Sequence, residues 1–92
     1  MIESIRHKGL KRLFEKNDSS KLPAEHLRKI RMILGIMHRA KSLNDINYSG
    51  SGLHKLSSDL AGFFAVKVSG NYRIIFRFED GSFHDVDYVD YH

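Results

Sequence analysis

The sequence of 92 residues contains no cysteine. Neither a disulfide framework nor a zinc site with thiolate ligands can form, and a small chain without either support fits the reducing cytoplasm, where we expect the protein to act. A long apolar run is also missing from the first ten residues, MIESIRHKGL, which mix charged and apolar side chains. We therefore expect neither a signal peptide nor a membrane span, and no membrane partner.

Internal repeats and low-complexity tracts are missing as well. Hydrophobic residues make up 41% of the chain and charged residues 28%, which is too apolar for intrinsic disorder. A chain of this size buries only about 60% of its unfolded surface, so it can build one sheet with a few helices but not a Rossmann fold or a barrel. We therefore expect residues 1–92 to form a single domain.

Two well-known binding signatures do not occur. The G-x-x-x-x-G-K-[ST] motif of phosphate-binding loops is absent, and the YSGSG segment at residues 48–52 is better explained as a flexible connection. His54, His84 and His92 could converge on zinc, but the sequence has neither an H-E-x-x-H helix nor histidines at i, i+4. We expect no metal and no other cofactor.

The net charge of +4 is unevenly distributed. Residues 1–41 carry eleven Lys or Arg against four Asp or Glu, a net charge of +7, whereas residues 42–92 carry four against seven, a net charge of −3. A basic half favours a polyanionic partner, because cations displace counterions from phosphates. Two solvated helix faces are an alternative that charge alone leaves open.

The N-terminal half predicts two helices. Gly9 indicates a break after a possible edge strand at residues 2–6, and Leu10, Leu13 and Phe14 then form one apolar stripe of a short helix. A longer helix opens at Pro23, which suits a first turn. Its core positions recur at helical spacing: Leu27, Ile30, Ile33, Leu34 and Met37. Its other sides are basic and include Arg28, Lys29 and Arg31.

The C-terminal half predicts strands at residues 63–68, 72–79 and 83–88, joined by turns at 69–71 and 79–81. In the second strand Ile74 and Phe76 fall on one side, whereas Arg73, Ile75 and Arg77 fall on the other. Two hairpins in sequence form an antiparallel meander, whose apolar face needs a cover. We therefore predict an α+β domain with two N-terminal helices packed on a small, twisted, mainly antiparallel sheet.

Groups suited to cutting RNA cluster near the C-terminus. Asp90, Tyr91 and His92 follow a predicted strand, where they could approach Arg73, and His54 lies in a loop before the first hairpin. An imidazole, a carboxylate and a guanidinium can together cleave a phosphodiester without a metal, by moving protons and stabilising charge. Ordinary surface histidines remain an alternative that the residues alone leave open.

Five segments in order resemble the HigB toxins of the RelE superfamily: MIESIRHKGLKRLFE at the start, LPAE at 22–25, LHKL at 53–56, GNYRIIF at 70–76 and VDYVDYH at 86–92. The resemblance covers nearly the whole chain. It implies a RelE-like fold and a toxin that enters the ribosomal A site and cleaves the translated mRNA. It also implies inhibition by a HigA-like antitoxin with a helix-turn-helix domain, through which alone the toxin would meet DNA.

The resemblance assigns site residues by position. Those that match the family's active site are His54, Arg73, Asp90, Tyr91 and His92. We expect a second set to contact mRNA and the 70S ribosome: Arg28, Lys29, Arg31, Lys55 and Arg77. Family members often carry a lysine at the position of Ser57 and an arginine at the position of Leu60. This chain has neither cation, so Lys55 is the nearest positively charged residue in that loop.

Two other functions stay open. The missing cations favour an RNA- or antitoxin-binding module with weak or no cleavage. A DNA-binding protein is the second alternative, although no helix-turn-helix pattern is visible.

Overall fold

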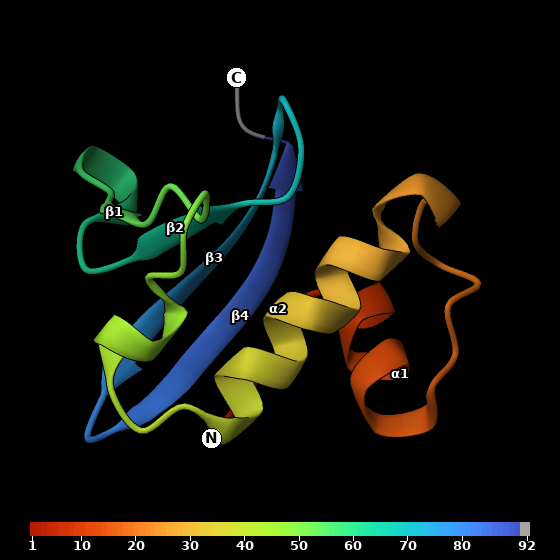
Figure 1. The fold of residues 1–92 in the computed structure, drawn as a ribbon, viewed down its shortest axis with the longest axis horizontal. Helices are drawn as coiled ribbons and strands as arrows, with labels where there is room; N and C mark the ends of the chain where they lie inside the picture. Colours follow the sequence, from red (N-terminus) through yellow and green to blue (C-terminus); the bar gives the residue numbers. More distant parts are fainter. Residues whose placement is uncertain (91–92) are drawn as a thin grey trace.

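The computed structural model describes residues 1–90 (Figure 1). Its elements follow one another as α1 (Lys8–Lys16), the 3-10 turn η1 (Ala24–His26), α2 (Leu27–Arg39), η2 (Leu43–Ile46), β1 (His54–Lys55), η3 (Ser58–Leu60), β2 (Phe64–Lys67), β3 (Tyr72–Glu79) and β4 (Ser82–Asp90). None of the helices in this part of the chain is long and apolar enough to cross a bilayer.

The four strands form one sheet in the order β1-β2-β3-β4, and every neighbouring pair is antiparallel. This confirms the predicted meander of two hairpins. The segment predicted as an edge strand pairs with β4 through two isolated parallel bridges, Ile2 with Phe83 and Ile5 with Val86. It is therefore a short parallel border of the sheet and not a continuous strand.

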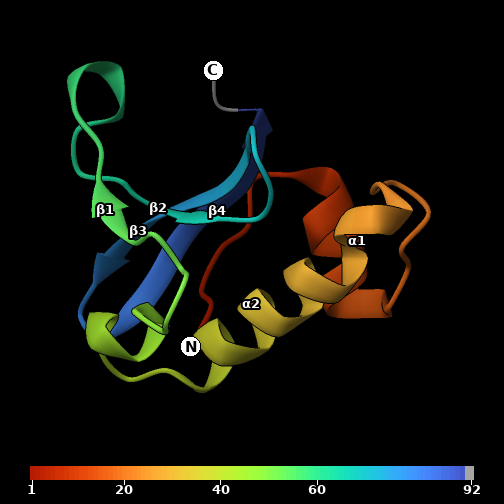
Figure 2. The same cartoon turned by 45° about the horizontal axis from the view of Figure 1, so that its top comes forward.

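One face of the sheet packs against both helices. Val66, Ile74 and Phe76 are fully buried on this face and share one hydrophobic cluster with Leu10 of α1 and Ile33 of α2. Figure 2 shows both helices on the same side of the sheet, with η3 lying away from them beyond β1. Full burial of Ile74 and Phe76 confirms the predicted core side of that strand.

The opposite face is only partly covered. Ile75 lies here as predicted, but it is buried with Phe63 and Ala65 under side chains of the loop around η3 and of β4, namely Leu56, Leu60 and Val89. Beyond this small cluster the strands carry polar and charged side chains. We call the part of this face that carries His54, Lys67 and Arg73 the open face.

Two local expectations are wrong. Gly9 is not a break but lies inside α1, where its amide and that of Leu10 donate to Nδ1 of His7, the residue that caps the helix. A Cβ atom on Gly9 would lie 2.9 Å from a carbon of the His7 ring, so glycine leaves room for this cap. His54 is not in a loop, because β1 pairs it with Ala65 of β2.

Candidate active site

His54 is presented at the edge of the sheet. Its register partner is Ala65, and its imidazole Nδ1 lies 2.8 Å from the carbonyl oxygen of Gly52. A carbonyl only accepts hydrogen bonds, so in this hydrogen bond Nδ1 carries the proton. The backbone thus fixes one tautomer of an exposed imidazole.

Arg73 is held at the turn between β2 and β3. Its Nη1 donates to the carbonyl oxygens of Ser69 at 2.7 Å, and of Gly70 and Tyr72 at 3.1 Å each. Its register partners are Lys67 on one side and Val89 on the other. The guanidinium is therefore on the face predicted from the strand alternation, and it also stabilises the turn.

Asp90 lies on the strand next to Arg73 but on the other side of the strand alternation. In the register of β3 and β4, Asp90 is opposite Tyr72, whereas Arg73 is opposite Val89. The cause is an irregularity in β4, where Asp85 takes a left-handed backbone conformation with φ of 52°. A bulge of this kind inserts one residue and reverses the facing of every residue that follows.

Tyr91 and His92 lie outside the described residues. The structure thus brings His54 and Arg73 to one face, places Asp90 at the end of the neighbouring strand, and leaves the other two predicted active-site residues without description.

An aromatic cluster that the sequence did not reveal lies beside Asp90 on the helix side. Tyr72 stacks on Tyr88 with ring centroids 5.2 Å apart, and Nδ1 of His26 shares a hydrogen bond with the Tyr88 hydroxyl. Burial, together with the nearby Tyr72, Glu25 and Asp90, raises the pKa of Tyr88 to about 12. This phenol is neutral at physiological pH and ties η1 to the end of the sheet.

Lys67 is a second feature that sequence reasoning missed. Its side chain is exposed and stands directly opposite Arg73. The alternation of β2 already separated Lys67 from Val66, but only the register shows that it meets an arginine.

The predicted RNA contacts are engaged within the chain to different degrees. Arg77 pairs with Asp85 and Glu79, and its hydrogen bond to Asp85 lowers the pKa of that carboxyl. Lys55 is opposite Phe64 and therefore faces away from the His54 side. On α2, Lys29 lies over the Tyr48 ring, Arg31 donates to Asn17 Oδ1, and Arg28 is exposed.

A stronger concentration of cations lies along α1. A groove of about 500 Å³ is lined by the side chains of Lys8, Lys11, Arg12, Lys16 and Lys21, with Glu15 among them. The signal was present in the sequence, because four of these cations, Lys8, Lys11, Arg12 and Lys16, fall within the nine residues of α1. Their crowding disfavours the isolated helix and is typical of a surface that meets a polyanion.

Metal ligands do not gather in the described part of the chain. Within residues 1–90 no group of three or more His, Asp or Glu side chains could hold a metal ion. The open face carries the imidazole of His54 and the two cationic side chains of Lys67 and Arg73.

The fold matches that of a solved structure over nearly the whole chain. A chain from "The structure of YoeB dimer from Staphylococcus aureus" superimposes with a TM-score of 0.60 at 16% sequence identity, covering 99% of this chain and 97% of that one. At this identity the likeness shows the fold alone. The predicted RelE-like α+β architecture is confirmed.

The chain belongs to the HigB-like toxins, the RelE-like toxins of type II toxin-antitoxin systems, whose pattern it matches over residues 3–92. Endoribonuclease HigB of Proteus vulgaris is 38% identical over 92 residues, which is 100% of both chains. The family and the enzyme class predicted from the sequence are thereby confirmed. Membership of a toxin-antitoxin family also implies an antitoxin partner.

Proposed function

We propose that this toxin is an endoribonuclease that cleaves mRNA in the A site of the 70S ribosome and so inhibits translation in the cytoplasm. The observation that carries the proposal is the placement of the His54 imidazole and the Arg73 guanidinium on one open sheet face. The whole-length similarity to an endoribonuclease supports it. The inhibiting partner is a HigA-like helix-turn-helix antitoxin, through which alone the toxin meets DNA.

The reaction needs proton transfers and charge stabilisation. A base removes the proton of the ribose 2′-hydroxyl, and the resulting oxygen attacks the adjacent phosphorus. The bond from phosphorus to the 5′-oxygen breaks, and an acid gives that oxygen a proton, which leaves a 2′,3′-cyclic phosphate and a 5′-hydroxyl. The substrate supplies the nucleophile, so the protein needs no nucleophile of its own.

The roles follow from the side chains available. We assign His92 as the base and His54 as the acid or as a contact to the phosphate, because the hydrogen bond between His54 Nδ1 and the Gly52 carbonyl fixes the orientation of the His54 ring. Asp90 orients an imidazole, and Tyr91 stacks on a base of the mRNA. Arg73 binds the phosphate oxygens as charge develops on them.

The ribosome completes the site. By holding the mRNA in one conformation it supplies positioning that a free nuclease must provide with its own side chains. The basic N-terminal half contacts phosphates of ribosomal RNA through Arg28, Lys29 and Arg31, and Lys55 and Arg77 contact RNA near the sheet. Electrostatic attraction of this kind gives affinity without sequence preference.

A second candidate function is RNA or antitoxin binding with weak or no cleavage. The observation that favours it is the loop around η3, where Ser57 and Leu60 stand at positions that carry cations in many family members. The two candidates differ in one measurable respect, which is cleavage of mRNA on the ribosome.

The test is primer extension on a defined mRNA, with purified toxin, in the presence and absence of 70S ribosomes. We expect new 5′ ends in the A-site codon only when ribosomes are present, and none with a toxin that lacks His92. The His92-deleted toxin should keep its circular dichroism spectrum and its affinity for the antitoxin. Cleavage without ribosomes, or equal cleavage by the truncated toxin, contradicts the proposal.

A further inference from the structure

A histidine caps the first helix. His7 is the N-cap of α1, and its Nδ1 lies 3.0 Å from the amide nitrogen of Gly9 and 3.2 Å from that of Leu10. Both amides donate, so Nδ1 accepts, and the proton of the neutral ring is then on Nε2. The side chains that usually cap helices are those of Ser, Thr, Asp and Asn. An imidazole differs from them because it takes up a proton between about pH 5 and 8.

The surroundings of the His7 ring hold it in the capping position. An added Cβ on Gly9 would lie 2.9 Å from Cε1 of the imidazole and 3.1 Å from Nδ1. The ring also meets Tyr88 of β4 edge to face, with centroids 5.5 Å apart and planes at 83°. Glycine is unfavourable inside a helix, so its presence here is explained by the room that the ring needs. The cap is thus built around an imidazole.

A proton on Nδ1 would turn the acceptor of this cap into a donor. The amides of Gly9 and Leu10 would then face an N–H group, and both residues are buried, Leu10 with 0% of its surface exposed. Little water can replace the lost hydrogen bonds, and unpaired buried donors are costly. The new charge would also lie at the positive end of the α1 dipole. Protonation therefore opposes the helix through the cap and through the dipole.

The charged groups around His7 cannot replace it as a cap. Those that line the same groove are Lys8, Lys11, Arg12, Glu15, Lys16 and Lys21. Lysine and arginine have no acceptor, and Glu15 is eight residues further along the helix, about 12 Å away. Towards the sheet, burial and the nearby Tyr72, Glu25 and Asp90 raise the pKa of Tyr88, and the Tyr88 hydroxyl is hydrogen-bonded to His26. The two amides thus depend on the neutral His7 ring.

We propose that His7 makes the first turn of α1 a pH-sensitive switch, which is capped while the imidazole is neutral and opened by its protonation. The toxin then loses stability as the pH falls through the range in which imidazole titrates. The sign follows because the unfolded chain takes up this proton without losing a cap, so acid favours unfolding. The switch reaches the core, since Leu10 packs in the same cluster as Ile74 and Phe76. This inference goes beyond the proposed function and does not depend on it.

Urea denaturation at pH 8 and pH 5, the limits between which imidazole titrates, compares the parent with His7→Asn. Asparagine is a good N-cap whose carbonyl oxygen accepts in the place of Nδ1 and does not titrate. From pH 8 to pH 5 the ratio of unfolded to folded molecules should rise about fivefold more in the parent than in His7→Asn, the factor that one N-cap typically contributes. An equal rise in both proteins overturns the inference.

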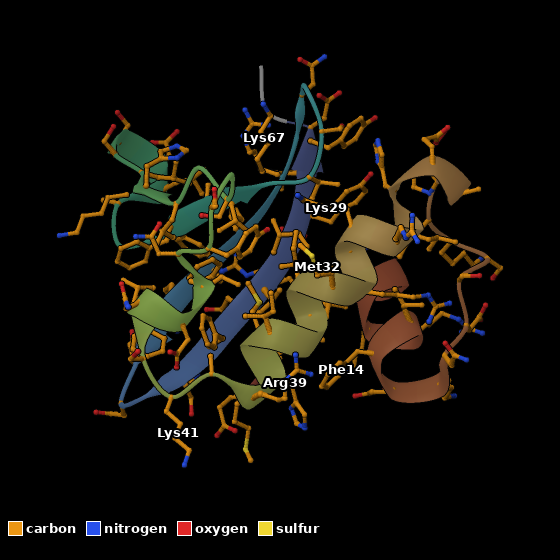
Figure 3. All side chains as sticks on the ribbon, viewed as in Figure 1. Phe14, Lys29, Met32, Arg39, Lys41 and Lys67 are labelled. Carbon is orange, nitrogen blue, oxygen red and sulfur yellow. The ribbon has the colours of Figure 1, made fainter. Side chains whose placement is uncertain are left out.

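The matched control is His38→Asn, the same substitution at the other end of a helix. His38 lies in the last turn of α2 and packs edge to face on Phe14, with ring centroids 5.3 Å apart. Figure 3 shows Phe14 of α1 beside Arg39 of α2, at the groove that His38 also lines. A cation stabilises this end of a helix, so His38→Asn should leave the rise in acid at least as large as in the parent. A reduction equal to that of His7→Asn contradicts a specific role of the cap.

A measurement on the parent alone observes the ring directly and needs no variant. NMR correlations between the ring protons and nitrogens of the isotope-labelled toxin distinguish the two neutral tautomers, and at pH 8 we expect the His7 proton on Nε2. As the pH falls, the protection of the Gly9 and Leu10 amides from hydrogen exchange, relative to the unfolded chain, should decrease in step with the protonation of the ring. A proton on Nδ1 of His7 at pH 8, or protection that does not follow the ring, overturns the inference.

Discussion

The two faces of the β-sheet bury apolar side chains to very different extents. On the helix side, seventeen buried hydrophobic residues of the described chain form one cluster, whereas the opposite side has a cluster of three. The same strand serves both: β3 places Phe76 in the large cluster and Arg73 on the open face. Because side chains alternate along a strand, stability and chemistry can be assigned to different faces of one element.

The comparison predicts that the largest loss of stability comes from the helix side. Phe76 is fully buried and packs with Phe64 and Phe83, so Phe76→Ala should lower the free energy of unfolding by about 3–5 kcal/mol. A small domain is stable by only about 5–15 kcal/mol. Chemical denaturation monitored by circular dichroism measures the change, and an unaltered midpoint would show that this face is not the core.

A substitution on the open face should affect the rate of cleavage more than the stability of the fold. In the proposed mechanism Arg73 donates to the phosphate oxygens as their charge develops, so we expect Arg73→Ala to slow cleavage of ribosome-bound mRNA by about 100- to 1,000-fold. The loss of stability should be smaller than for Phe76→Ala, because Arg73 is only half-buried, although its bonds to the turn carbonyls are lost. If the variant cleaves at the parental rate, Arg73 only stabilises the turn between β2 and β3, and another cation must stabilise the charge on the phosphate.

The strand β3 shows how much of this comparison the sequence predicts. Alternation over residues 72–79 was sufficient to place Ile74 and Phe76 inside and Arg73 outside, because a half-buried strand has a period of two. The helical stripes of residues 10–14 and 27–37 were equally informative, since their apolar positions recur with the period of a helix. These patterns determined the fold class.

The position of Asp90 could not be predicted in the same way. If β4 were regular, Asp90 would face away from Phe83 and lie on the side of Arg73. The bulge at Asp85 depends on a left-handed conformation of a residue other than glycine, and no local pattern signals it. His54 was missed as a strand residue because β1 has only two residues, too few for any alternation.

A smaller effect is expected from the charges on α2. Reversing Arg28, Lys29 and Arg31 together should weaken ribosome binding about tenfold and reduce its salt dependence, because each lost phosphate contact releases fewer counterions. The matched variant reverses Lys8, Lys11 and Lys16 in the groove along α1. Ribosome binding is measured by sedimentation at low and high salt. If the affinity of the parent does not depend on salt, the cations of α2 and of α1 do not contact phosphates and only face the solvent.

The smallest effect concerns pH. The pKa of the Tyr88 phenol is about 12 in the folded protein, above its ordinary value of 10.0. The contribution of this phenol to the stability of the fold is therefore complete below about pH 10 and is lost as the pH rises through about 12. Tyr88→Phe keeps the stacking on Tyr72 but removes this titration. Between pH 10 and 12 the free energy of unfolding should fall less steeply in the variant than in the parent, by at most about 1.4 kcal/mol per pH unit. Equal slopes in urea denaturation would contradict the assignment.

The most direct test of the separation between the two faces uses one histidine from each. His54 lies on the open face, and His26 lies on the helix side, hydrogen-bonded to Tyr88. We expect His54→Ala to slow single-turnover cleavage of ribosome-bound mRNA by about 100-fold or more without a change in the denaturation midpoint. His26→Ala should lower the midpoint and leave the cleavage rate of the folded protein near that of the parent. Parental cleavage by His54→Ala, with cleavage lost in a folded His26→Ala protein, would place the chemistry on the helix side and contradict the account.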